Sequence, residues 1–298
     1  MQTLRIEGTP RWGQRDGRAV KLVALALAAC VPLLGAGCQD SSATAPPRYL
    51  QAVFRASDFV DPRNAGNRWF RLIPGRQLIR QGTTLIGNRQ VPYQVITTVT
   101  DVTRRIDGVR TVLVYDSELG TGQTTQRSLD YLAQDKAGNL WLMGGATESF
   151  EAGRFVDVSD VWMSGVEGAR PGILFPADPA AAKAWVIDTH PGEKSVAQFV
   201  AIRKNCVPFS CFDKVLVTRE GTQDAPNNEL KYYAFGLGQV RNDPQGDSRH
   251  DDTELLLNAI QLSPKGLTEA SNAARLIDQR AADQWPKFYS AARASRKP

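Results

Sequence analysis

The chain of 298 residues contains only two histidines and four cysteines, and this scarcity limits the chemistry it can carry. Catalysis by Ser, Cys or a metal usually enlists a histidine that a carboxylate orients. His190 lies in a Pro-Gly turn and His250 in a charged run, and no Gly-x-Ser-x-Gly elbow supplies a nucleophile. The His and Cys residues also lack the clustering of zinc ligands. The sequence therefore predicts no catalytic residue, no metal site and no cofactor.

A long apolar run and a strongly basic body are absent as well. The apolar stretch over residues 22–37 has 16 residues, whereas a membrane-spanning helix needs about 20. Five basic and two acidic residues among the first 37 contribute +3 of the formal net charge of +5. The remaining +2 is not the basic footprint of a nucleic-acid-binding protein, so we expect no nucleic-acid partner.

What is present first is an export signal. A basic segment ending at Lys21 precedes the apolar stretch, which closes with LLGAGC and then turns polar. These residues resemble the lipobox of bacterial lipoproteins, which implies cleavage before Cys38 and its acylation with a fatty acid such as palmitate. LAAC, ending at Cys30, is the alternative site, but apolar residues follow it. An uncleaved membrane anchor is the other alternative.

The resemblance implies a signal peptide over residues 1–37 and a lipidated tether over 38–48. The lipid would hold the protein on a membrane of the bacterial cell envelope, facing the periplasm or the cell surface. Two acyl chains or more hold a protein on a membrane far more firmly than one.

The body, residues 49–262, has the pattern of antiparallel β structure. In the clearest segment, runs rich in Val, Thr and Ile flank Asp107 and Gly108, and Asp-Gly between such runs predicts a tight hairpin. Turn signals recur along the body, and strands do not alternate with long helical patterns. We predict a mainly β fold, an antiparallel meander forming a sandwich or a half-open barrel, with a C-terminal α-helix.

Two segments depart from the strand pattern. Residues 164–185 contain repeated Gly and Pro and are predicted to form a long ordered loop or a crossover. Residues 263–298 form the predicted C-terminal helix and tail. Apolar residues recur there at helical spacing before Pro286, which should end or kink the helix. Packing on the body is the favoured role for this helix, and binding a partner is the alternative.

Cys206 and Cys211 are separated by four residues that include a proline. In an oxidising compartment such a close pair predicts a local disulfide. Two free thiols or a redox pair are the alternatives.

The stretch KYYAFGLGQVR, residues 231–241, invites a nucleotide-binding interpretation that its details exclude. A dinucleotide-binding loop needs a third glycine and a helix after it, and RNDPQGD follows instead. We therefore interpret Gly236 and Gly238 as sites where the backbone turns or bends. Tyr232 and Tyr233 should face opposite sides of the strand, one buried and the other exposed as part of a candidate binding face.

The same stretch resembles the Tyr-Tyr-Ala-Pro-Gly-x-Gly-x-Val signature of a group of uncharacterised bacterial envelope proteins, with Phe235 in place of the Pro. The segments NRWFRLIPGRQLIRQG, RRIDGVRTVLVYDSE, LDYLAQDKAGNLWLMGG, WMSGVEGARPGILFPADP and SCFDKVLVTRE extend the resemblance over residues 67–241. The fold is also similar in outline to the half-open barrels of envelope lipoprotein carriers. The resemblance names no activity.

The function expected from the sequence is that of a non-catalytic envelope lipoprotein. It would bind an apolar or extended ligand, or another envelope protein. An envelope hydrolase using carboxylates and a purely structural surface protein are the alternatives. Asp and Glu are scattered through the sequence, so no catalytic pair can be selected.

Overall fold

The computed structural model describes residues 47–61, 66–86, 89–226, 228–245 and 253–293, so Cys30, Cys38 and His250 lie outside the described residues. The strands are β1 (Arg76–Ile86), β2 (Arg89–Ile106), β3 (Val109–Gly120), β4 (Gln123–Gln134), β5 (Leu140–Glu151), β6 (Arg154–Met163), β7 (Arg170–Phe175), β8 (Ala184–His190), β9 (Glu193–Cys206), β10 (Cys211–Thr222), β11 (Glu229–Ala234), β12 (Gly238–Pro244) and β13 (Thr253–Gln261). The helices are η1 (Ala56–Asp58), α1 (Pro179–Ala182), α2 (Pro264–Gln284) and α3 (Pro286–Arg293).

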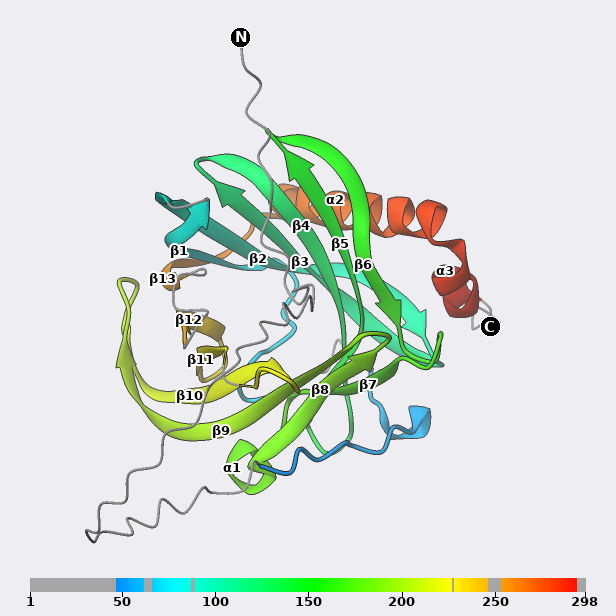
Figure 1. Ribbon diagram of the computed structural model, residues 1–298, viewed down its shortest axis with the longest axis horizontal. Coiled ribbons are helices and arrows are strands. Elements are labelled where there is room, and N and C mark those ends of the chain that lie inside the picture. The colour runs from blue at the N-terminus through cyan, green and yellow to red at the C-terminus, as the bar shows by residue number, and fades with distance from the viewer. Residues whose placement is uncertain (1–46, 62–65, 87–88, 227, 246–252, 294–298) are drawn as a thin grey trace, which may run out of the picture.

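Twelve of these strands close into an antiparallel barrel, seen as a ring of strands in Figure 1. Their order is β4-β3-β2-β1-β13-β12-β11-β10-β9-β8-β7-β5, and β5 pairs back with β4. The predicted mainly β, antiparallel fold with a C-terminal helix is confirmed. Of the two predicted arrangements, the molecule has the barrel, and the β4–β5 pairing completes it.

The sheet branches at β5. The first part of this strand pairs with β7, and its later part, from Gly144 to Glu151, pairs with β6. Strand β6 therefore leaves the ring where β7 enters it. Strands β7 and β8 pair only at Arg170–Thr189 and Pro171–Asp188.

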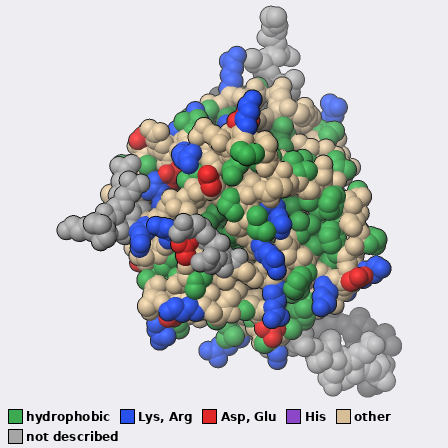
Figure 2. All heavy atoms as spheres, turned by 180° about the vertical axis from the view of Figure 1, so that it is seen from behind, with side chains coloured by type: hydrophobic (Ala, Val, Ile, Leu, Met, Phe, Trp, Pro, Cys, Tyr) green, Lys and Arg blue, Asp and Glu red, His purple; other side chains and the backbone are tan. Residues whose placement is uncertain are grey.

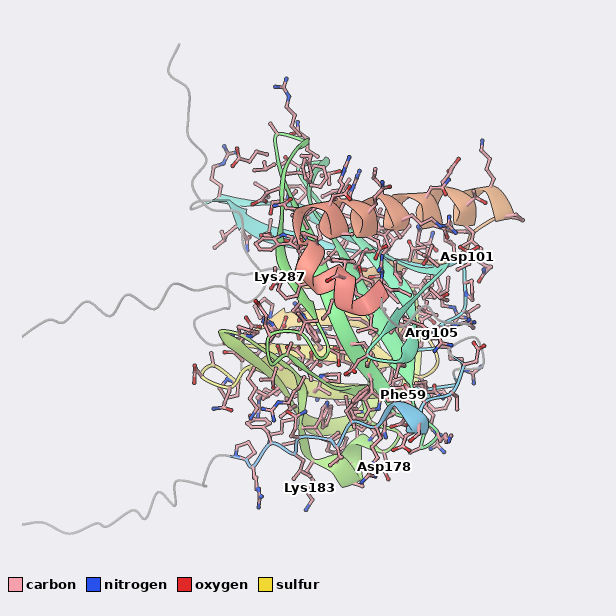
Figure 3. All side chains as sticks on the ribbon, turned by 90° about the vertical axis from the view of Figure 1, so that its right-hand side faces the viewer. Phe59, Asp101, Arg105, Asp178, Lys183 and Lys287 are labelled. Carbon is pink, nitrogen blue, oxygen red and sulfur yellow. A yellow bond between two sulfur atoms is a disulfide. The ribbon has the colours of Figure 1, made fainter. Side chains whose placement is uncertain are left out.

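The C-terminal helices pack on the outer face of strands β2 to β6, as Figures 1 and 3 show from two directions. The apolar residues that recur at helical spacing in α2 include Ala274, Ile277 and Ala281. They are buried against outward-facing residues of the barrel such as Leu129. Because two of these three residues are alanines, helix α2 can lie close to the sheet. No helix within the described ranges is long and apolar enough to cross a membrane.

A buried polar network also attaches these helices to the barrel. The Arg104 guanidinium donates to both carboxylate oxygens of Asp278 on α2, with 2.7 Å for the Nε contact. The Tyr131 hydroxyl donates to Asp278 Oδ1 at 2.9 Å and lies 2.8 Å from the Tyr289 hydroxyl of α3. Arg104 also stacks over the Tyr289 ring, 4.7 Å from its centroid. Because the network is charge-assisted and partly buried, it fixes the helices to β2 and β4.

Residues 66–75 close one end of the barrel. Trp69, Phe70 and Leu72 are buried among inward-facing apolar residues of the strands. Asn67 holds this segment in place: its Oδ1 accepts from the Trp69 backbone N–H at 2.9 Å, and its Nδ2 donates to the Gly138 carbonyl at 2.8 Å. The closed end is therefore an apolar plug made by the chain that precedes β1.

The stretch KYYAFGLGQVR forms the β11–β12 hairpin, which docks on this plug. Ala234 pairs with Gly238, so the two glycines, with φ of 76° and 114°, close a chain reversal instead of bending one strand. The Gly236 N–H donates to the Arg68 carbonyl at 2.6 Å. A Cβ added to Gly238 would lie 2.7 Å from a ring carbon of Phe70, whereas one on Gly236 would come no closer than 4.0 Å to a neighbour, Arg71 Nε. The spacing of the glycines therefore reflects a tight turn against a neighbouring backbone.

Gly238→Ala is expected to lower the free energy of unfolding by about 1–3 kcal/mol, because it adds both positive-φ strain and overpacking against Phe70. Gly236→Ala shares the positive φ but not the contact, so it should cost about 1 kcal/mol. Urea denaturation of both variants measures the difference. Equal losses would show that the plug does not restrict position 238.

Residues 164–185, predicted as a loop or crossover, contain a buried strand and a short helix. Strand β7 pairs with β5 and β8, and α1 follows with Asp178 as its cap. A Cβ on Gly172 would come within 2.5 Å of the carbonyl oxygens of Val186 and Ile187. Glycine here permits close strand approach, which the sequence pattern suggested only as a chain break.

Cys206 and Cys211 form the predicted disulfide at the end of the β9–β10 hairpin. Between them, Val207 is buried in an apolar cluster that includes Tyr232, and the Phe209 N–H donates to the Leu256 carbonyl at 3.1 Å. The hairpin end therefore covers Tyr232 from outside the barrel.

Candidate functional site

The barrel encloses a cavity of about 370 Å³ whose lining changes from apolar to polar along each strand. Side chains alternate between the two faces of a strand, so every second residue points inward. On β4 the inward series runs from Leu132 to Asp130 and on towards the start of the strand, and on β11 it runs from Tyr233 to Glu229. Leu132 and Tyr233 lie in the cluster around the plug. The cavity therefore has an apolar floor and polar upper walls.

Carboxylates dominate the charged part of the lining. The two cationic side chains are Arg80 and Lys231, and the nine acidic ones are Asp116, Glu118, Asp130, Asp160, Asp188, Glu193, Glu220, Glu229 and Glu254. On the outer face shown in Figure 2, by contrast, the charged side chains are mostly Lys and Arg. The acidic character of the cavity lining is thus not shared by the face in Figure 2.

Both cations are bound within one half of the lining. The Arg80 guanidinium donates from Nε to Glu254 and from Nη1 to Thr97 Oγ1 at 3.0 Å. Lys231 Nζ lies 3.0 Å from Glu229 and 3.4 Å from Glu220. Although burial acts to lower it, these two carboxylates hold the pKa of Lys231 above its ordinary value. Each cation therefore has a carboxylate partner on the protein, and carboxylates still outnumber cations in the lining.

The lining also contains a carboxylate cluster, defined here as Asp130, Asp160, Asp188 and Glu193. Asp188 and Glu193 flank the β8–β9 turn, Asp130 lies on β4 and Asp160 on β6. The cluster lies around the branch in the sheet, where β6 leaves the barrel wall. Asp160 has a φ of 50°, next to a register shift between β5 and β6. This backbone conformation is unusual for a residue with a side chain and is a feature of many functional sites.

Three members of the carboxylate cluster have strongly raised pKa values. Burial, then the negative charges of Asp116, Asp188 and Asp160, raise the pKa of Asp130 to about 7. Burial and then Glu193 and Asp160 raise the pKa of Asp188 to about 7. Burial and then Asp160 raise the pKa of Glu193 to about 7. Like charges in a partly desolvated site disfavour ionisation, so the cluster stores electrostatic repulsion near neutral pH.

Asp188 is the most buried of the four, with 4% of its surface exposed. Its Oδ1 has no hydrogen-bond partner. His190 Nε2 is 3.6 Å from that oxygen, but burial lowers the pKa of His190, so the imidazole is neutral at pH 7 and provides no counter-charge. A buried carboxylate oxygen that faces a cavity without a donor is suited to accept from a ligand.

Trp162 forms the wall beside the carboxylate cluster. Its indole stacks on the His190 imidazole, with ring centroids 5.5 Å apart and 15° between the planes. Trp162 is paired across the sheet with Gly145, which is paired in turn with Asp130. A Cβ on Gly145 would lie 3.2 Å from the indole Nε1, so the missing side chain leaves room for the ring. The cluster therefore combines negative charge with a flat, largely apolar surface.

The sequence-predicted residues lie mostly elsewhere. Tyr233 lines the cavity, and its hydroxyl donates to Glu220 at 2.9 Å. Tyr232 lies on the opposite side of β11 beneath the disulfide hairpin, and Arg241 lies 5.0 Å above its ring. The two tyrosines do face opposite ways, but the expectation that one is exposed is wrong, because 3% and 4% of their surfaces are accessible.

The predicted turn residues do not line the cavity. Asp107 and Gly108 have φ of 48° and 80° in the β2–β3 hairpin, and Ser164 donates to Asp107 at 2.8 Å. Sequence reasoning missed the carboxylate cluster and Trp162. The only sequence feature that points to the carboxylate cluster is the run DTHPGE, in which Asp, His and Glu surround one turn. Among the described residues, no three His, Cys, Asp or Glu side chains are arranged to hold a metal ion.

Comparison with known proteins gives two structural similarities. No protein-family model matches the chain, and no curated protein does. A "putative exported protein with YmcC-like fold" from Bacteroides fragilis aligns with a TM-score of 0.36 and 11% identity, over 65% of this chain and 100% of its own. A "putative lipoprotein" from Parabacteroides distasonis gives the same TM-score and identity, over 65% of this chain and 99% of its own.

Proposed function

We propose that this chain is a non-catalytic lipoprotein of the bacterial cell envelope whose barrel binds a small ligand. The observation that supports ligand binding is the cavity of about 370 Å³, which is within the range of small-molecule sites. Its carboxylate-rich walls favour a polar or charged ligand over an apolar one, which was among the ligands and partners expected from the sequence. The location rests on the lipobox-like residues before Cys38.

Binding is favoured over catalysis by the charge of the lining. Nine acidic and two cationic side chains line the cavity, and burial raises the pKa of Asp130, Asp188 and Glu193 to about 7. Carboxylates that repel one another in a partly desolvated site favour the entry of a positive charge.

A carboxylate hydrolase is the second candidate, because carboxyls with raised pKa that converge in a cavity are also a common feature of active sites. The two functions differ in the fate of the ligand. A binding protein returns the recovered ligand at unchanged mass after incubation, whereas a hydrolase returns fragments.

Native mass spectrometry of the protein purified from its own membrane tests the proposal. We expect a chain that begins at an acylated Cys38 and carries a small non-covalent ligand. Cys38→Ser should remove the acyl mass and leave the ligand in place, because the tether is separate from the barrel. Cys30→Ser is the control and should change neither. An unacylated wild-type chain would contradict the anchor, and an empty chain would contradict ligand binding.

A further inference from the structure

We propose that the carboxylate cluster of Asp130, Asp160, Asp188 and Glu193 binds the ammonium group of a small aliphatic amine whose carbon chain lies on the adjoining apolar lining. This inference rests on the proposed ligand-binding function and specifies the chemical class of the ligand.

The first step is charge. Arg80 and Lys231 are bound to Glu254, Glu220 and Glu229. The lining has nine acidic side chains against these two cations, and the one imidazole beside the carboxylate cluster is neutral at pH 7. A cationic group entering here would relieve repulsion that the barrel otherwise carries.

The second step is the hydrogen-bonding capacity of Asp188. Asp188 lines the cavity, and its Oδ1 is buried and accepts no hydrogen bond from the protein. An ammonium group has three N–H donors and no acceptor, so one of its donors can satisfy Asp188 Oδ1. Charge-assisted bonds of this kind are roughly twice as strong as neutral ones.

The third step separates an organic cation from a metal ion. The described residues contain no set of three ligating side chains at metal-binding geometry. The lining beside the cluster is apolar: the stacked Trp162 and His190 form one wall, and Ile187 and Leu142 lie towards the floor. A hydrated divalent ion gains nothing from these surfaces, whereas the methylene groups of an aliphatic amine are removed from water there.

The fourth step is pH. The groups that face Asp188 are Glu193 from β9, His190 from its own strand, Asp160 from β6 and Asp130 from β4. The carboxyls among them bind an ammonium group when ionised, and protonation removes their charge. Affinity should therefore rise as pH passes upward through about 7, where burial and neighbouring charge place the pKa of Asp188.

Isothermal titration calorimetry with 1,5-diaminopentane tests the inference. At about pH 8 and low salt we expect saturable binding of one diamine per barrel, and about tenfold weaker binding for Asp188→Asn, which loses one charge-assisted contact. Lowering the pH to about 5.5 should weaken binding to the wild type by a similar factor or more. Asp213→Asn is the matched control: it makes the same charge change at an exposed site on the outer surface and should bind like the wild type.

Two probes test the chemical class. The neutral diol 1,5-pentanediol has the same chain length and should not bind, and Mg²⁺ should bind more weakly than the diamine. The inference is overturned by no diamine binding, by equal binding of diol or Mg²⁺, or by an Asp188→Asn variant that binds like the wild type. If the diamine does not bind and a ligand of other chemistry co-purifies with the protein, the amine inference is overturned but the proposed ligand-binding function stands. An empty cavity in protein from its own membrane overturns the proposed function itself.

Discussion

Glu254→Ala is expected to lower the free energy of unfolding by about 3–5 kcal/mol, because it leaves the buried Arg80 guanidinium without its main partner. Arg80 and Glu254 have 4% and 1% of their surfaces exposed. They connect β1 with β13, next to a register shift at Ile79 and Arg80. Urea denaturation at about pH 7 measures the loss.

A double variant separates the ion pair from the packing. Arg80→Met with Glu254→Leu removes both charges and keeps apolar volume, so it should recover most of the lost stability. The exposed pair Lys204–Asp213, at 3.6 Å, provides the control: Asp213→Ala should change stability by at most about 0.5 kcal/mol. A Glu254→Ala variant as stable as wild type would mean that water in the cavity solvates Arg80.

Arg80 also shows why the site was hard to foresee from the sequence. In the segment RQLIRQGTT, the alternation of polar and apolar residues predicts that Arg80 faces solvent. In the barrel it shares the inward face with Leu78, and both line the cavity. Alternation gives the period of a strand but not which face is inside.

Strand β4 gives the clearest case of this ambiguity. In the sequence SLDYLAQD, Leu129 and Tyr131 look like core residues and Asp130 like a surface residue. Leu129 and Tyr131 are indeed buried, but beneath α2 and α3 on the outside of the barrel. Asp130 points into the cavity. The inner and outer faces of β4 are distinguished only by the packing of the C-terminal helices, which are distant from β4 in the sequence.

Local features were predictable because local chemistry determines them. Asp-Gly between β-branched runs predicted the hairpin at Asp107 and Gly108, and the close cysteine pair predicted the disulfide. The helical spacing and Pro286 predicted α2 and its end. The carboxylate cluster instead draws on β4, β6, β8 and β9, which closure of the barrel brings together. Nothing in the spacing of these residues marks them as neighbours.

Asp188→Asn is expected to stabilise the ligand-free protein above neutral pH, by roughly 2–4 kcal/mol at about pH 8, because burial and neighbouring charge raise the pKa of Asp188 to about 7. A carboxyl whose pKa is raised on folding binds more protons in the native state than in the unfolded state. Its contribution to stability is complete below the unfolded pKa, near 4, and is lost as pH rises through about 7. The amide stays neutral throughout, so the two proteins should be equally stable at about pH 4 and diverge above it.

Urea denaturation of both proteins across this range gives the difference curve, in which other titrating groups largely cancel. Asp213→Asn, at an exposed position, should show no such divergence. An Asp188→Asn variant that is less stable than wild type at about pH 8 would show that the hydrogen bond from Ser195 outweighs the repulsion around the native Asp188 carboxylate. Saturating diamine adds a second requirement. Above pH 7 it should stabilise the wild type by about 1.4 kcal/mol more than the variant, because the variant binds about tenfold more weakly and stabilisation by a ligand bound only to the folded state grows with the logarithm of affinity. The repulsion that destabilises the empty barrel is the same interaction that an ammonium group would relieve. A stable empty barrel at high pH would therefore argue against both the stored repulsion and the proposed amine site.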